Sequence, residues 1–207
     1  MPIAEGRHEE NGVTNTFCDV IVYPMVWNKL YRRNFLMDNN LRFEEGKVHE
    51  DNIFAFDISC IHKVFYIVKA VTYFCRIREN SIMTDDNKRR KIDDCVMVLD
   101  SVKKRVERFA NADGIYDLYM HYVKKVIRWI SAIDMDKELV GFADEKMRGC
   151  LDAIPSVRCL GSKHDRLAYF GCRNEQTYSR YQYITTVYAN TTRGRILRNL
   201  LNLLPHA

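Results

Sequence analysis

The 207 residues suffice for a domain with a real core, and 47% hydrophobic and 12% aromatic residues exclude a disordered chain. No apolar stretch is long enough to cross a bilayer, and the opening MPIAEGRHEENG lacks the apolar segment of a secretory signal. The net charge of +5 lies near the end, because residues 158–207 hold 8 Lys or Arg against 2 Asp or Glu. Such a surface favours an anionic partner: a phosphate-rich substrate, nucleic acid or an acidic membrane face.

The first part of the chain mixes strand and helix patterns. β-branched and aromatic residues predict strands, whereas apolar residues at three- and four-residue spacing predict helices. In chain order, we expect a strand over 17–27 interrupted at Pro24, a helix over 28–40, a turn at 44–46, a helix over 50–64 and strands over 65–77. We therefore predict an α/β fold for residues 1–85.

The second part, residues 86–207, is predicted to be mostly helical. Apolar positions three and four residues apart recur over several turns. We expect helices over 87–110, 112–133 and 137–154, the last broken near Gly141, then a loop-like aromatic stretch over 156–195 and a basic amphipathic helix over 193–204. The acidic TDD (84–86) and DMD (134–136) are interpreted as helix-flanking charges.

Glu50 and Asp51 stand at the start of the predicted helix, where two interpretations are open. Acids in a first helical turn satisfy unpaired N–H groups and complement the helix dipole, so both residues have a structural explanation. Alternatively, one ionised carboxylate faces a cleft and accepts the proton of a substrate hydroxyl.

Two basic stretches are also open to two interpretations. Arg76 and Arg78 are either solvated charges at a strand end or a clamp for phosphate oxygens. Lys29 follows Trp27 in an aromatic and basic stretch that is either an ordinary helix or a surface that stacks on a sugar or a base.

Several classes of site have no signature in the sequence. The six histidines lack metal-ligand spacing, and no phosphate-binding glycine loop, nucleophile elbow or nucleic-acid reading helix is present. The seven cysteines, at irregular spacings, match neither a disulfide framework nor a zinc pattern, so we expect buried, reduced thiols in a cytoplasmic protein.

Four short motifs occur together between residues 20 and 84: WNKLYR at 27–32, FEEG at 43–46, EDNIF at 50–54 and YFCRIRENS at 73–81. In this order they resemble the second half of the catalytic domain of bacterial family 2 glycosyltransferases of the capsular and exopolysaccharide type. The resemblance implies the acceptor-side half of a GT-A-like, Rossmann-like domain. It also implies inverting sugar transfer from a nucleotide-sugar to a glycan or lipid-linked acceptor.

The resemblance also implies roles for single residues. It makes Asp51 the catalytic base and Glu50 a capping or neighbouring acid. Arg76 or Arg78 would face the diphosphate, and Trp27 and Lys29 would belong to the acceptor side or to the core beneath it. No second carboxylic acid is required, since the nucleotide diphosphate leaves as an anion.

The donor half of that family, with its Asp-x-Asp-like motif for Mg²⁺ or Mn²⁺, has no counterpart before residue 17. We therefore expect a truncated or split enzyme whose complete form uses the metal, while this chain alone binds neither metal nor nucleotide well. A non-catalytic remnant or binding subunit for a separate donor-binding chain is the alternative. Exposed apolar surface at the missing half would favour self-association, and we expect no nucleic-acid partner.

The C-terminal helix has two possible roles. Ile196, Leu197, Leu200, Leu201 and Leu204 share a face, with Arg193, Arg195 and Arg198 nearby. The helix either packs on the body of the protein or lies on the anionic inner face of a membrane.

Overall fold

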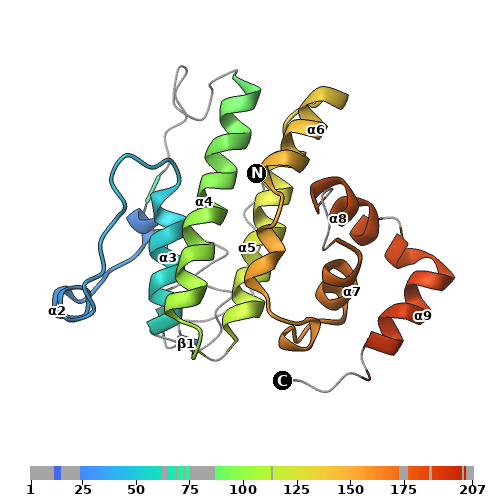
Figure 1. Ribbon diagram of the computed structural model, residues 1–207. Coiled ribbons are helices and arrows are strands. Elements are labelled where there is room, and N and C mark those ends of the chain that lie inside the picture. Colours follow the sequence, from blue (N-terminus) through green and yellow to red (C-terminus); the bar gives the residue numbers. More distant parts are fainter. Residues whose placement is uncertain are drawn as a thin grey trace. The chain divides into compact units, whose positions relative to one another are not determined.

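The computed structural model describes residues 12–14, 24–61, 65–68, 70–71, 73–74, 87–112, 114–172, 177–186, 188–201 and 203. The chain divides into two compact units, Met1–Thr84 and Asp85–Ala207. Figure 1 shows the elements of both units in chain colours. The division falls next to residue 86, where the sequence pattern changes from mixed to helical.

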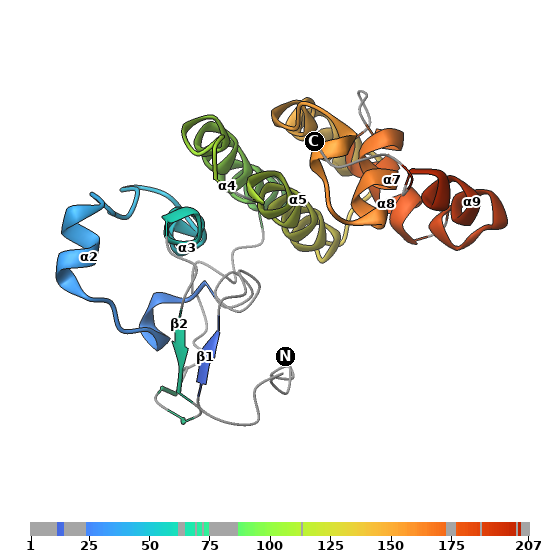
Figure 2. The same ribbon diagram turned by 90° about the horizontal axis from the view of Figure 1, so that it is seen from below.

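The first unit combines short helices with one pair of strands. Strand β1 (Gly12–Thr14) pairs antiparallel with β2 (Phe65–Ile67), and Val13 lies opposite Tyr66 (Figure 2). The helices are η1 (Val26–Asn28), α2 (Arg33–Asp38) and α3 (Glu50–Ile61). The turn predicted at 44–46 is confirmed, and Gly46 adopts a left-handed φ of 69° there, which glycine tolerates without strain.

Helix α3 is the centre of this unit. Its residues 52–59 are all buried, so the helix is covered on every side and not along a single stripe. The ring of Phe43 stacks on the ring of Phe54 with 4.3 Å between the centroids. Tyr31 packs edge-on against the Phe54 ring, at 5.5 Å between the centroids. These aromatic contacts fix the chain that precedes α3 against its first turns.

The α/β prediction for residues 1–85 is wrong: the fold is helical. Among the described residues, the strands are two three-residue segments in one antiparallel pair. A Rossmann-like domain instead needs several buried parallel strands joined by crossover helices. Within the described part of the β-rich run 65–77, the strand covers Phe65–Ile67, and the predicted strand over 17–27 lies mostly outside the described residues. Its described end, Val26–Asn28, is a 3-10 helix.

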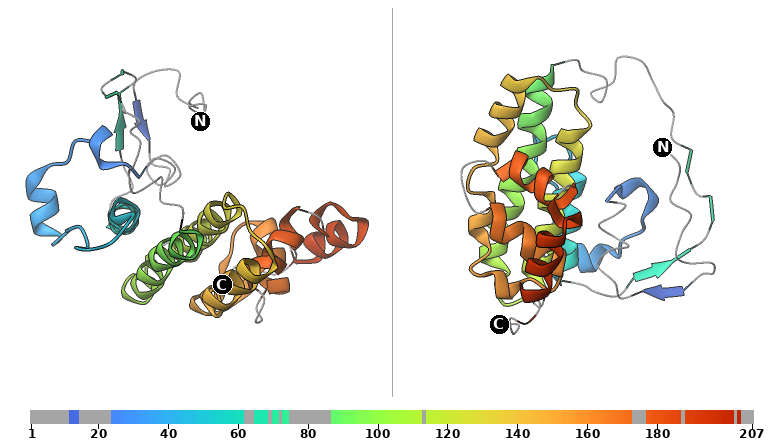
Figure 3. Two further views of the ribbon diagram at one scale, coloured as in Figure 1. Left: turned by 90° about the horizontal axis from the view of Figure 1, so that it is seen from above. Right: turned by 90° about the vertical axis from the view of Figure 1, so that its right-hand side faces the viewer.

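The second unit begins with a helical hairpin. Helices α4 (Lys88–Arg108) and α5 (Ile115–Ser131) lie side by side (Figure 1, Figure 3). They confirm the predictions over 87–110 and 112–133. The Asn87 side chain caps α4 by accepting from the Arg90 N–H at 3.0 Å. The apolar stripes of the two helices bury Ile92, Leu99, Val102, Tyr119, Val126 and Ile130.

Helix α6 (Lys137–Lys146) packs along the first half of α4. Asp136 caps it by accepting from the Leu139 N–H at 2.9 Å, which confirms the helix-flanking role of DMD at 134–136. TDD at 84–86 lies outside the described residues. The predicted break near Gly141 is wrong, because Gly141 lies inside α6. The chain turns instead at Gly149, whose φ is 71°, before η3 (Cys150–Ala153).

The stretch 156–195, predicted to be loop-like, is largely helical. It contains η4 (Val157–Cys159), α7 (Lys163–Cys172), α8 (Thr177–Thr186) and η5 (Tyr188–Asn190). The start of α8 is held by Asp144 of α6, which accepts from the Ser179 N–H at 3.0 Å and from its hydroxyl at 2.6 Å. A helix start stabilised by an acid 35 residues earlier carries no local signal in the sequence.

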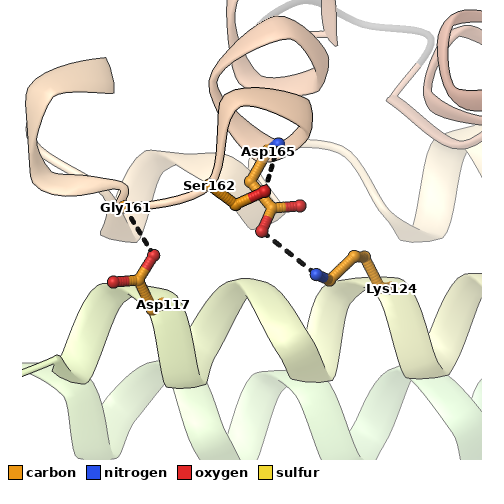
Figure 4. A network of polar contacts seen from close by, with 5 residues as sticks. All are labelled: Asp117, Lys124, Gly161, Ser162 and Asp165. Atoms are coloured by element: carbon orange, nitrogen blue, oxygen red, sulfur yellow. Dashed lines mark hydrogen bonds and ion pairs between the residues drawn. The ribbon is translucent and has the colours of Figure 1, made fainter. Parts of the chain in front are cut away.

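A polar network joins α5 to the segment that opens α7 (Figure 4). Asp117 accepts a hydrogen bond of 2.8 Å from the Gly161 N–H, and Lys124 forms an ion pair of 3.0 Å with Asp165. The hydroxyl of Ser162 accepts from the Asp165 N–H at 3.4 Å. Two acids on different elements thus fix the approach of α7 to α5.

The C-terminal helix α9 (Thr192–Leu201) packs on α7 and η5. This confirms the helix predicted over 193–204 as far as Leu201; Asn202 and Leu204 of the predicted range lie outside the described residues. Arg166 of α7 is buried, with a guanidinium that donates to the Leu160 carbonyl and to the Leu201 carbonyl at 2.9 Å. The arginine therefore satisfies a carbonyl at the end of α9 that has no partner within its own helix.

Five cysteines fall within the described residues, and all are free thiols. Cys95, Cys150 and Cys172 are buried, while Cys60 and Cys159 are half-buried. Burial raises the pKa of the three buried thiols to about 12, so they are protonated and unreactive at neutral pH. The expectation of buried, reduced cysteines agrees with these positions.

Candidate functional site

The described part of the first unit holds four of the six predicted site residues: Glu50 and Asp51 begin α3, and Trp27 and Lys29 lie earlier in the chain. Trp27 lies in η1, and Lys29 follows that turn with extended backbone (φ −131°, ψ 150°). Arg32, which precedes α2, is also extended. The predicted helix over 28–40 is therefore shorter than expected and runs only over Arg33–Asp38. Residues 29–32 thus lie outside any helix.

Asp51 is half-buried in the first turn of α3. The Asn52 side-chain amide donates to Asp51 Oδ1 at 2.8 Å, and the Asn52 N–H donates to the His49 carbonyl at 3.0 Å. His49 has a left-handed φ of 63°, which is uncommon for a residue other than glycine. The backbone turn at His49 thus sets the direction in which α3 starts and where its first carboxylates lie.

Lys29 and Tyr31 share the electrostatic environment of Asp51. Burial lowers the pKa of Lys29 to about 8, and the Asp51 charge opposes that shift. Burial raises the pKa of Tyr31 to about 12, and the same Asp51 charge adds to the increase. The Lys29 ammonium donates to the Met25 carbonyl and to Asn28 Oδ1, each at 2.8 Å. The charge of Asp51 therefore acts on both Lys29 and Tyr31, and we call these three residues the Asp51 cluster.

Within its described residues, the first unit, which contains the Asp51 cluster, also has three half-exposed aromatic rings. Trp27 stacks on Tyr73 at 4.4 Å between centroids, and the two residues are 46% and 50% exposed. Trp27 therefore does not belong to the core beneath the site, which was one of its two predicted places. Phe43, at 45% exposure, stacks on the buried Phe54. Half-exposed rings of this kind offer flat apolar faces to a ligand that also carries polar groups.

Glu50 is the first residue of α3 and is half-buried next to Asp51. Its place in the first turn fits the capping and dipole role. The two acids are neighbours in sequence, so their side chains leave the helix about 100° apart. Of this pair, only Asp51 is coupled to both Lys29 and Tyr31.

The remaining predicted site residues, Arg76 and Arg78, lie outside the described residues. Within the described ranges, no group of three or more His, Cys, Asp or Glu is placed to hold a metal ion. The surroundings of Asp51 do not fit Mg²⁺ or Mn²⁺, because the neighbouring groups are an ammonium and an amide that donates to the carboxylate. We therefore do not propose a metal ion at the Asp51 cluster.

Two residues that interact with Asp51 were not predicted as site residues. Tyr31 falls within the helix predicted over 28–40, whereas in the structure residues 29–32 lie outside any helix. Asn52 follows the acidic pair directly, and its short amide side chain next to Asp51 was the available signal.

None of the helices in the described part of the chain is both long and apolar enough to cross a membrane. No protein-family model, curated protein or solved structure matches the chain. The resemblance to family 2 glycosyltransferases therefore rests on the sequence motifs alone.

Proposed function

We propose that the first unit provides the acceptor side of an inverting sugar transfer, with Asp51 as the proton acceptor. The observation that carries this proposal is the Asp51 cluster: a half-buried carboxylate whose charge acts on Lys29 and Tyr31, two residues that follow the exposed Trp27 in the chain. The motif resemblance supports the same assignment. The proposal concerns the chemistry of these residues and does not require a GT-A fold.

In the proposed reaction, a sugar or lipid-linked hydroxyl lies against the Trp27 ring and donates its proton to Asp51. The acceptor oxygen bonds to the anomeric carbon of a nucleotide-sugar as the bond from that carbon to the diphosphate oxygen breaks. The nucleotide diphosphate leaves as an anion, so the step balances without a second acid. A separate donor-binding part supplies the nucleotide-sugar.

A second candidate is a non-catalytic sugar-binding subunit. The half-exposed rings of Trp27, Tyr73 and Phe43 are sufficient for stacking on a sugar whether or not transfer follows. This candidate predicts saccharide binding without release of a nucleotide diphosphate, whereas the transferase requires both.

Saccharide binding can be measured through Trp27. The chain has two tryptophans, so Trp129→Phe leaves Trp27 as the only indole. We expect methyl glycosides or N-acetylglucosamine to change the emission of this variant in a saturable way. The matched control is Trp27→Phe, which retains Trp129 of the second unit and should give no response. Equal responses from both variants, or no response from either, would contradict both candidates.

Transfer can be measured by nucleotide diphosphate release from UDP- and GDP-sugars in the presence of Mn²⁺, the acceptor glycoside and any donor-binding chain. We expect Asp51→Asn to lower the rate by roughly 10²- to 10⁴-fold while the Trp27 response persists. Asp38→Asn, at an exposed acid that ends α2, is the matched control and should leave the rate unchanged. Near-normal turnover by the Asp51 variant would exclude its role as the base.

A further inference from the structure

The apolar face of the C-terminal helix α9 has a covered side and an exposed side. One side, with Gly194 and Leu201 buried and Leu197 half-buried, packs against α7. On the other side Ile196 and Leu200, four residues apart, are each 56% exposed, and Leu203 follows at 80%. Because an α-helix advances 100° per residue, Ile196 and Leu200 lie roughly 110° around the helix from the centre of the buried residues, at the solvent-facing edge of the same apolar face. We call Ile196, Leu200 and Leu203 the outer row.

Basic residues flank the outer row. Arg193 and Arg195 are exposed and lie on either side of it around the helix, while Arg198 is half-buried. The sequence from residue 176 to the end contains four arginines and no Asp or Glu. The outer row is therefore set in a surface of one charge sign, which excludes a basic partner.

An aromatic pair lies beside the same helix. Tyr183 of α8, 55% exposed, stacks on Tyr188 of η5 at 6.5 Å between centroids, and η5 packs on α9. Tyrosine combines an apolar ring with a polar tip and suits a boundary between apolar and aqueous phases.

We infer that α9 docks the second unit on an anionic lipid surface. The outer row would enter the acyl boundary, and Arg193 and Arg195 would bind lipid phosphates. A nucleic-acid backbone would use the arginines but gain nothing from three exposed aliphatic side chains. The charge and the apolar row together fit a lipid headgroup layer. The inference rests on the second unit and stands independently of sugar transfer by the first.

Vesicle flotation of the full chain tests this inference. We expect flotation with vesicles of phosphatidylcholine mixed with phosphatidylglycerol, weaker flotation with phosphatidylcholine alone, and loss at high salt. Each basic residue near an anionic surface strengthens binding roughly fivefold, so Arg193→Gln with Arg195→Gln should weaken it by about 30-fold. Ile196→Gln with Leu200→Gln should weaken binding to both kinds of vesicle.

Two variants in other helices are matched controls. Met37→Gln changes a 59% exposed apolar side chain in α2, and Lys104→Gln removes an exposed charge in α4. Both should float like the unchanged chain. The inference is overturned if the chain does not float with anionic vesicles, or if the controls lose as much binding as the α9 variants.

Insertion of the outer row into the lipid can also be measured directly, without a variant that loses binding. In a chain without Trp27 and Trp129, both changed to Phe, Leu200→Trp places the only indole in the outer row. We expect its emission to shift to shorter wavelength when anionic vesicles are added. An unchanged emission in the presence of bound vesicles would show that another surface makes the contact.

Discussion

At the scale of single residues, the cost of a charge depends on the solvent around it. The second unit contains two Lys–Asp pairs of similar length, Lys124–Asp165 at 3.0 Å and Lys88–Asp134 at 3.2 Å. The side chain of Asp165 is 4% exposed, whereas that of Asp134 is 99% exposed. The same chemical pair therefore stands in two dielectric environments, which allows a matched comparison.

We expect Lys124→Met to lower the free energy of unfolding by about 3 kcal/mol, because it leaves the buried Asp165 carboxylate without that counter-charge. Lys88→Met should change it by less than about 0.5 kcal/mol. Urea unfolding of both variants measures the difference. Adding Asp165→Asn to Lys124→Met should recover part of the loss, and equal effects of the two single variants would contradict this account.

Lys29 predicts a dependence of stability on pH. The pKa of its side chain is about 8 in the folded chain and 10.5 in the reference state, so between these values the unfolded chain binds more protons. The contribution of Lys29 to stability therefore rises as pH increases from about 8 to 10.5. Unfolding followed at Trp27 in the Trp129→Phe chain measures this rise, and adding Lys29→Met should remove it.

Asp51 modulates the same titration. Its charge raises the pKa of Lys29 against the effect of burial, so Asp51→Asn should move the pKa below 8 and start the rise at lower pH. A pH dependence that is identical with and without Asp51→Asn would show that the two groups are not coupled.

At the scale of elements, α7 and α8 approach closely at a glycine. A Cβ atom on Gly171 of α7 would overlap Ile184 Cδ1 of α8. We expect Gly171→Ala to destabilise the chain by about 1 kcal/mol, since the overlap outweighs the better helix propensity of alanine. In an Ile184→Val chain the overlapping methyl is absent, so Gly171→Ala should be neutral or stabilising. Thermal unfolding of the four chains measures this change of sign.

Local patterns predicted those elements whose signals lie within their own sequence. Helices α4 and α5 have apolar stripes that repeat over several turns, and Asn87 supplies a cap within the same segment. Helix α8 was missed because its first turn is held by Asp144 of another helix. The strands of the first part were over-predicted, because β-branched composition shows that a segment suits a sheet but does not supply neighbouring strands.

In the candidate site, too, the features with a local sequence signal were predicted and those that depend on distant residues were not. The acids Glu50 and Asp51 were located correctly in the first turn of α3. Lys29 and Tyr31, on which the charge of Asp51 acts, lie in a segment outside any helix, whereas the sequence pattern predicts a helix over 28–40. The roles proposed for these residues remain predictions.

At the scale of the whole molecule, the division into two units has a direct consequence. The second unit has a core of its own, formed by the apolar faces of α4, α5, α7 and α8. We expect residues 85–207 alone to fold cooperatively and to retain the helical circular dichroism of this unit. The fragment should also bind anionic vesicles. Non-cooperative unfolding of the fragment would show that the second unit requires residues 1–84.

Arg166 connects the last turn of the chain to the interior. Since its guanidinium donates to the Leu201 carbonyl as well as to the Leu160 carbonyl, pulling α9 away would remove a hydrogen bond from a buried positive charge. A partly detached α9 would leave the buried Arg166 guanidinium with fewer hydrogen bonds than in the packed state. We therefore expect α9 to leave the body in one step. Any force transmitted through this helix, such as attachment to a surface, would reach α7 directly through the Arg166–Leu201 hydrogen bond and the packing of α9 on α7.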